Sequence, residues 1–306
     1  MSAPPLAAIS NLDGRRSGKE PAILCYALGG GLGHLTRTRA ALYTLGIDER
    51  TALVMSPMAM ARDRRVVGDA CPIIAPLEQE RYRNGLGAWV EKMVKEIGPT
   101  RLLLDAFPSG ILGELHDTSL LHDLSIIHLA RRLRWSVYAP MLKGKGLRFD
   151  QVYRLEELEP EHERYLRDHA GTIDDLALAD PPICAGDDED RVIASLRDGA
   201  RPLWIIVHAG SREEVLELAR MAAGVPGAGR GPSRVVVVSP GAVVDGFECV
   251  DIYPASLLFP IADRIITAGG FNVMRQAAPF RERHTAYPLT RRFDDQRWRV
   301  GQSRGG

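Results

Sequence analysis

A glycine-rich turn that ends in a histidine is the part of this chain whose residue types best suit chemistry. The turn, Gly29-Gly-Gly-Leu-Gly-His34, lies between an apolar run at 22–28 and a segment at 35–45 with helical spacing of its leucines. The pattern predicts a strand, a turn and the start of a helix. Backbone amides at a helix start bind anions such as phosphate, and histidine takes up or releases a proton near neutral pH. We therefore expect an anion site with a titratable group beside it.

This turn matches only part of the G-x-G-x-x-G fingerprint of dinucleotide-binding proteins. His34 takes the position at which close packing of helix on strand requires glycine. The next predicted strand ends in Ser56, where an acidic residue would bind a ribose hydroxyl. Binding of NAD is therefore only a minor alternative.

The second half of the chain carries further turns of the same kind. A strand predicted at 203–207 runs into His208-Ala-Gly-Ser211, and Thr267-Ala-Gly-Gly-Phe-Asn272 again joins a strand end to a helix start. Arg291 and Arg292 follow another predicted strand, and guanidinium groups suit phosphate oxygens. Together these turns and charges predict a diphosphate ligand.

The composition is that of a globular protein without a charge bias. The 306 residues are 45% hydrophobic and 25% charged, and Lys+Arg and Asp+Glu both number 39. This balance argues against nucleic acid or an acidic lipid surface as the main partner. Four scattered cysteines without a C-x-x-C pair, and no signal peptide, favour a cytoplasmic location. No apolar run approaches the length of a membrane span.

Predicted strands and helices alternate along the chain, which indicates parallel sheets flanked by helices. We expect an α/β protein of two Rossmann-like, doubly wound domains facing a cleft, where ligands meet the carboxyl ends of the strands. The expected parts are a flexible tail at 1–20, an N-terminal domain at 21–180 and a C-terminal domain at 181–306.

The expected elements follow from apolar runs, glycines and capping residues. Strands are predicted at 22–28, 51–56, 70–75, 101–105, 151–155, 176–178, 203–207, 234–238, 249–252, 264–267 and 285–287, and segment 125–129 is open between strand and helix. Helices are predicted at 35–45, 77–97 with an interruption near Gly85 and Gly87, 255–261, 271–278, and after Asp294. Ser211 and Glu214 have capping-box spacing, 187–190 is expected to be a solvated linker, and 227–232 a flexible loop.

Three segments resemble one family of enzymes. Gly31-Leu-Gly-His34 before a helix is similar to the amino-terminal loop of GT-B glycosyltransferases of the family 28 type, which include the N-acetylglucosaminyl transferase of peptidoglycan lipid synthesis. Segment 262–272, with Phe293-Asp-Asp-Gln296 downstream, resembles the nucleotide-sugar region of the same family. Asp105 to Leu115 is similar to a D-x-F-P-x-G-x-x-G-E-L segment of predicted bacterial glycosyltransferases. The resemblance covers roughly residues 21 to 300.

The resemblance implies inverting, metal-independent transfer of a sugar from a nucleotide-sugar donor, usually linked to UDP. The N-terminal domain would then bind the acceptor and the C-terminal domain the nucleotide sugar, which is a substrate, so no cofactor is expected. The acceptor is an unknown small molecule, lipid or polymer. Nucleic acid and a membrane span are not expected, and peripheral contact with a membrane stays open. The acceptor hydroxyl must lose a proton as it attacks, and the departing diphosphate gains charge.

The resemblance also assigns roles to single residues. His34 would be the catalytic base, Asp105 and Phe107 would lie on the acceptor side, and no metal ligand is expected. The donor-binding residues would be Gly31, Gly33, His208, Gly210, Ser211, Gly269, Gly270, Asn272, Gln276, Arg292, Asp295 and Gln296. Gln276 departs from the family, because related transferases usually carry glutamate there for the ribose hydroxyls.

Alternatives remain for both residues and function. His34 could cap its helix, and the basic segment at 131–135 could be a solvated face rather than contact with an anionic acceptor. A non-hydrolysing nucleotide-sugar 2-epimerase would need further carboxylates, for which Asp105 and Glu114 are the candidates. A catalytically degenerate nucleotide-sugar-binding protein is favoured by Gln276 and by the short carboxyl terminus.

Overall fold

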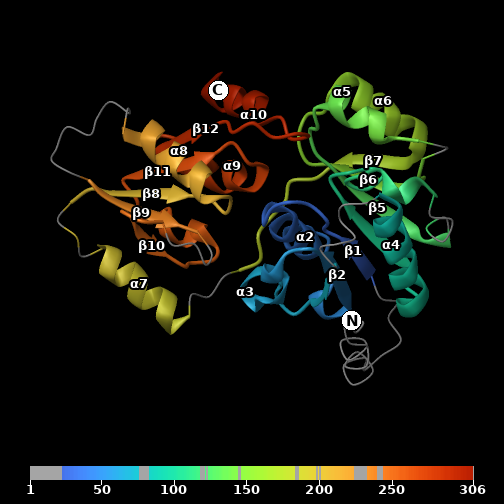
Figure 1. Cartoon of the computed structure of the whole chain (residues 1–306), viewed down its shortest axis with the longest axis horizontal. Helices are drawn as coiled ribbons and strands as arrows, with labels where there is room; N and C mark the ends of the chain where they lie inside the picture. Colours follow the sequence, from blue (N-terminus) through green and yellow to red (C-terminus); the bar gives the residue numbers. More distant parts are fainter. Residues whose placement is uncertain are drawn as a thin grey trace. The chain divides into compact units, whose positions relative to one another are not determined.

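The computed structural model describes residues 23–75, 83–117, 121, 123–143, 146–182, 186–197, 199, 201–223, 233–239 and 244–305 (Figure 1). The predicted tail at 1–20, the beginning of the helix predicted from 77 and the loop at 227–232 lie outside these residues. The chain divides into two compact units, Met1–Pro181 and Pro182–Gly306. No helix in the described part is both long and apolar enough to cross a bilayer.

The described part of the first unit is built on a parallel sheet of seven strands, in the order β3-β2-β1-β4-β5-β6-β7. The order reverses between β1 and β4, so the carboxyl ends of these two strands flank the point where such sheets bind ligands. The strands are β1 (Ile23–Tyr26), β2 (Ala52–Ser56), β3 (Cys71–Ile74), β4 (Arg101–Asp105), β5 (Ser125–Ala130), β6 (Phe149–Arg154) and β7 (Ala170–Asp175).

Helices and short 3₁₀ turns connect these strands (Figure 1). The helices are α2 (Gly33–Thr44), α3 (Arg64–Val67), α4 (Arg83–Ile97), α5 (Trp135–Tyr138) and α6 (Pro160–His169). The 3₁₀ turns are η1 (Glu49–Thr51), η2 (Ala59–Arg62), η4 (Glu114–Asp117) and η6 (Ala139–Met141).

Alternation along β4 decides which side chains meet which helix. Leu102 and Leu104 belong to the core cluster that includes Tyr26 of β1 and Val90 of α4. Because successive side chains of a strand point to opposite faces, Asp105 lies on the other face of the sheet. There it meets α2, a helix that buries polar as well as apolar side chains.

Two predictions for the first unit were wrong. Helix α4 runs through Gly85 and Gly87 without interruption, since its apolar face is buried; a Cβ at Gly87 would lie 3.0 Å from the carbonyl oxygen of Glu114. The last strand is β7, not 176–178, and α6 precedes it. The sequence of β7 lacks an apolar run because this strand lies at the exposed edge of the sheet. Segment 125–129, for which the sequence did not distinguish strand from helix, lies within strand β5.

The described part of the second unit contains a parallel sheet of five strands in the order β10-β9-β8-β11-β12, with helices on both faces. Its strands are β8 (Leu203–Val207), β9 (Arg234–Val238), β10 (Glu248–Val250), β11 (Arg264–Ala268) and β12 (His284–Tyr287). Its helices are α7 (Asp187–Arg197), α8 (Arg212–Ala223), α9 (Phe271–Ala277) and α10 (Gln296–Gly305), with 3₁₀ turns η7 (Ala255–Leu258) and η8 (Ala278–Phe280). Each unit is therefore a doubly wound, Rossmann-like α/β fold.

Two expectations for the second unit also need correction. The acidic run at 187–190 is the first turn of α7 and not a linker. Negative side chains are favourable there because the helix dipole is positive at its N-terminus. The helix expected at 255–261 is only the short 3₁₀ turn η7.

Candidate functional site

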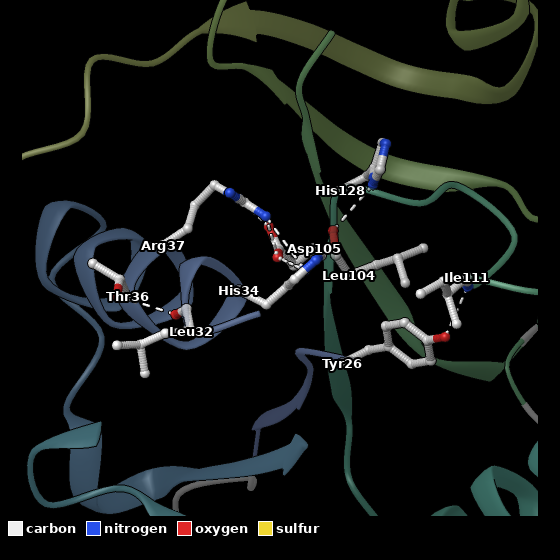
Figure 2. Close-up of polar contacts among 9 residues, drawn as sticks. All are labelled: Tyr26, Leu32, His34, Thr36, Arg37, Leu104, Asp105, Ile111 and His128. Atoms are coloured by element: carbon white, nitrogen blue, oxygen red, sulfur yellow. Dashed lines mark hydrogen bonds and ion pairs between the residues drawn. The ribbon is translucent and has the colours of Figure 1, made fainter. Parts of the chain in front are cut away.

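Three side chains of the first unit meet at the carboxyl ends of β1 and β4 (Figure 2). His34 Nδ1 lies 2.7 Å from Asp105 Oδ2. Arg37 donates to both carboxylate oxygens of Asp105, from Nε at 2.5 Å and from Nη2 at 2.7 Å. His34 is 8% exposed, Arg37 3% and Asp105 0%. We call these three residues the His34 triad.

The charges of the His34 triad decide where its protons lie. Burial alone would raise the pKa of Asp105, but the charge of Arg37 and the hydrogen bonds from His34 and Arg37 hold it well below its usual range. Burial lowers the pKa of His34, and the hydrogen bond to Asp105 offsets only part of that effect. Near neutral pH the imidazole is therefore neutral, and its Nδ1–H is donated to an ionised carboxylate. The lone pair is left on Nε2, as a general base requires.

The backbone after β4 aims Asp105 and Phe107 at the imidazole. Ala106 has a φ of +66°, and the Phe107 N–H bonds back to the Asp105 carbonyl at 2.8 Å. Such a three-residue turn with positive φ is uncommon and strained for a residue with a side chain. The Phe107 ring stacks on the His34 ring, with centroids 5.6 Å apart and an interplanar angle of 27°.

The glycines of the first turn have different roles. A Cβ at Gly29 would lie only 2.1 Å from His34 Nε2, whereas a Cβ at Gly30 or Gly31 would meet no described atom within 4 Å. Gly29 is therefore necessary for the observed placement of the imidazole. Gly31 and Gly33 are half-buried at the start of α2, where helix amides suit an anion.

A second histidine–carboxylate–arginine group lies in the second unit. His208 Nε2 is 2.7 Å from Glu214 Oε2, and Arg291 donates to both carboxylate oxygens of Glu214. These hydrogen bonds, chiefly those from Arg291, lower the pKa of Glu214 to about 2. Burial lowers the pKa of His208 below its ordinary value. A Cβ at Gly210 would lie 2.0 Å from Glu214 Oε2, so this turn also requires glycine beside the pair.

The predicted capping box at Ser211 is only half formed. Ser211 Oγ accepts the Glu214 N–H at 3.4 Å, as expected of an N-cap. The Glu214 carboxylate is bound by His208 and Arg291.

The turn from β11 to α9 contains two of the predicted donor residues, Gly269 and Gly270, and α9 carries two more. Gly270 is the N-cap of α9, and a Cβ there would meet only Val273, at 3.9 Å. Gly269 packs against α10, because a Cβ there would lie 2.7 Å from Val300 Cγ2 and 3.0 Å from the Gln296 carbonyl oxygen. Packing against α10 is therefore sufficient to explain why residue 269 is a glycine, without any contact to a ligand. Asn272 is buried and Gln276 half-buried, both on α9.

The remaining predicted donor residues of the second unit lie just before α10 or at its start. Asp295 Oδ1 accepts the Trp298 N–H at 3.1 Å, and Gln296 Oε1 accepts the Leu289 N–H at 3.0 Å. Both side chains thus have partners that organise this helix start, and their contact with a donor stays a prediction. Arg292 is exposed, with its guanidinium 4.6 Å from the Phe293 ring centroid.

Sequence analysis missed three residues that the structure brings into these sites. Arg37 follows His34 by three residues, a helical spacing that places both on one face and was an available signal. Glu214 was noticed only for its capping position. Arg299, which is buried, donates to the Gly269 carbonyl at 2.7 Å and to Asp294 at 3.0 Å; no sequence pattern indicated it.

Among the described residues, groups suited to an anion include the amides near Gly31 and Gly33, the turns at 208–211 and at Gly270, and the exposed Arg292. Among the residues that the structure describes, no group of three or more His, Cys, Asp or Glu side chains is arranged to hold a metal ion.

No protein family model matches the chain, and no curated protein matches its sequence. Solved structures are similar in fold. S. aureus MnaA in a structure with UDP has a TM-score of 0.56 at 10% identity, over 89% of this chain and 80% of that one. The kitacinnamycin glycotransferase has a TM-score of 0.53 at 13% identity, over 94% and 85%. UDP-N-acetylglucosamine 2-epimerase from Rickettsia bellii has a TM-score of 0.50 at 9% identity, over 84% and 76%.

At identities this low the likeness establishes the fold. The chain, with its two parallel sheets and flanking helices, is similar in fold to these neighbours, which include a glycotransferase and a 2-epimerase. The chain therefore has the α/β fold of GT-B glycosyltransferases.

Proposed function

We propose that the chain is an inverting, metal-independent glycosyltransferase related to family 28, which moves a sugar from a UDP-linked donor to an acceptor hydroxyl. The observation that carries the proposal is the His34 triad, a neutral imidazole held by an ionised, buried carboxylate at the carboxyl ends of β1 and β4, where sheets of this kind bind ligands. The GT-B fold supports the same class of reaction.

In this proposal Nε2 of His34 takes the proton of the acceptor hydroxyl as its oxygen attacks the anomeric carbon. The bond from that carbon to the diphosphate breaks on the opposite side, which inverts the configuration. Asp105 accepts the Nδ1–H and stabilises the imidazolium that forms, while Arg37 keeps Asp105 ionised so that it does not take the proton itself.

The second unit would bind the donor diphosphate. The departing diphosphate gains negative charge, which backbone amides and guanidinium groups stabilise. The turn at 208–211, the glycine turn at 269–270 and the exposed Arg292 supply such groups. Glu214 would repel a diphosphate if it were unpaired, so its ion pair with Arg291 is compatible with an anion nearby.

The 2-epimerase alternative is less well supported, because both candidate carboxylates are buried and bound. Glu114 is 3% exposed and accepts hydrogen bonds from Tyr26 and from the Leu112 N–H. Asp105 is held by His34 and Arg37.

Calorimetry with UDP, GDP, TDP and NAD, followed by assays of donor hydrolysis, tests the proposal. We expect a nucleoside diphosphate to bind and NAD not to bind, with slow hydrolysis of a UDP-sugar that releases the inverted anomer and is unchanged by a chelator. His34→Ala should abolish hydrolysis and keep UDP binding. His169→Ala, which removes a half-buried histidine from α6, is the matched control and should retain activity.

The outcomes separate the alternatives. Full activity in His34→Ala would refute the assignment of the base. Binding of UDP with no turnover of any donor would indicate a degenerate binding protein, and a sugar epimerised at C2 would indicate the epimerase.

A further inference from the structure

The loop at 107–114, which follows β4, is held by buried side chains from two other elements of the first unit. Tyr138 of α5 is one of them, and it is 0% exposed. Its hydroxyl accepts the Ser109 N–H at 3.0 Å and donates to the Gly110 carbonyl at 2.8 Å. Its ring contacts the Phe107 ring, with centroids 5.5 Å apart. Tyr138 therefore holds both the side chain that stacks on His34 and the backbone that follows it.

Tyr26 of β1 and Glu114 of η4 hold the far end of the same loop. Tyr26 donates its hydroxyl proton to Glu114 Oε1. The same hydroxyl accepts the Ile111 N–H at 2.9 Å (Figure 2). Glu114 Oε2 accepts the Leu112 N–H at 2.8 Å. Both side chains are buried, so these bonds satisfy polar groups that would otherwise be costly to bury.

The glycines of the loop fit this arrangement. Gly110 has a φ of +82°, and a Cβ there would lie 2.5 Å from the Glu114 carboxylate. Gly113 has a φ of +71°, and a Cβ there would lie 2.2 Å from the Met141 carbonyl oxygen. The spacing of glycines and glutamate in Asp105 to Leu115 thus follows from close packing of the loop on its buried anchors.

We propose that Tyr138, Tyr26 and Glu114 are positioning residues that hold the loop so that Phe107 fixes the imidazole of His34. The inference rests on the proposed function in one respect only, the role of His34 as the base.

The physical argument is that Phe107 lies in contact with both rings. Its ring is 5.6 Å from that of His34 and 5.5 Å from that of Tyr138, and it is 3% exposed. Aromatic contacts of this kind orient a ring without a hydrogen bond. If the loop loosens, Phe107 moves, water reaches the imidazole, and both the orientation and the desolvation of His34 change.

Tyr138→Phe, Tyr26→Phe and Glu114→Gln test this inference, because each removes a polar anchor and keeps the volume. The first readout is the titration of His34 by NMR on histidine-labelled protein, with the His34 signal assigned by its loss in His34→Gln. We expect the pKa of His34 to rise toward its ordinary value, because its burial is reduced. The second readout is donor turnover, with kcat lowered roughly 10-fold or more and the donor KM unchanged.

Tyr287→Phe is the matched control, because Tyr287 also donates its hydroxyl to a backbone carbonyl, that of Met221 at 3.1 Å in the second unit. It should leave the titration of His34 and kcat unchanged. If a tyrosine variant does not fold, the same titration is measured in Phe107→Leu. This substitution removes the aromatic ring and leaves every side-chain hydrogen bond of the loop in place.

An unchanged His34 titration in folded Tyr138→Phe or in Phe107→Leu would overturn the inference, whatever the activity. A second outcome is a changed His34 titration in these variants, with turnover unchanged both in them and in His34→Ala. This result would support the positioning of the ring and refute the role of His34 as the base. The two failures are thus distinguishable.

Discussion

Replacing Gly29 with alanine tests whether the placement of His34 gives the protein its activity. The added Cβ would lie 2.1 Å from His34 Nε2 and 2.3 Å from Cδ2, whereas ordinary contacts begin near 3.4 Å. The imidazole must therefore move by roughly 1 Å to relieve the overlap. Such a shift would disturb its bond to Asp105, now 2.7 Å, and misplace the proton acceptor.

A displacement of about 1 Å in a catalytic group costs on the order of 100-fold in rate. We therefore expect Gly29→Ala to lower kcat for donor hydrolysis by about that factor. UDP affinity, measured by calorimetry, should stay within about 2-fold, because the proposed diphosphate site lies in the second unit.

Gly30→Ala is the matched control, because a Cβ there would meet no described atom within 4 Å and the residue is exposed. It should keep kcat close to that of the unmodified protein. Full kcat in both Gly29→Ala and Gly30→Ala would refute the argument that Nε2 must face the space beside Gly29. An equal loss of kcat in both variants would show that the turn responds to any side chain, which also contradicts the argument.

Further predictions concern the titration of buried groups. The base must be neutral, and burial lowers the pKa of His34, so the acid limb of kcat/KM should have its midpoint below pH 6.5; a midpoint above 6.5 would contradict this. Burial lowers the pKa of His162 to about 3, so unfolding takes up a proton below pH 6.5 and stability is lost as pH falls. His162→Phe, which can keep the stacking on Trp135, should remove about 2 kcal/mol of the destabilisation between pH 7 and pH 5, measured by urea unfolding. Glu214→Gln should lower the pKa of His208 further, because the carboxylate hydrogen bond that partly offsets its burial is lost; an upward shift by NMR would refute this.

The local patterns of the chain were sufficient for most elements. Strand β4 begins and ends where its apolar run and Asp105 predict, and α2 ends at Thr44, before the positive φ of Gly46. Strand β4 is buried, so its sequence carries a continuous apolar run. The edge strand β7 was missed because half-exposed strands need no such run.

The candidate site was predicted only in part. His34, Asp105 and Phe107 were each chosen from the sequence, but Asp105 was assigned to the acceptor rather than to His34. The two residues are far apart along the chain and meet only because β1 and β4 are neighbours in the sheet. Strand order depends on packing of the whole unit, and no local pattern carries it.

By itself, the sequence determined the alternation of strands and helices, the glycine turns at their junctions and the chemical types available there, because these depend on neighbours within a few residues. Tertiary structure alone decided that Arg37 and His34 share one carboxylate, that Gly29 leaves space for an imidazole and that two buried tyrosines hold the loop after β4. Those contacts join segments up to 88 residues apart, and their geometry follows from sheet order and close packing rather than from local propensity.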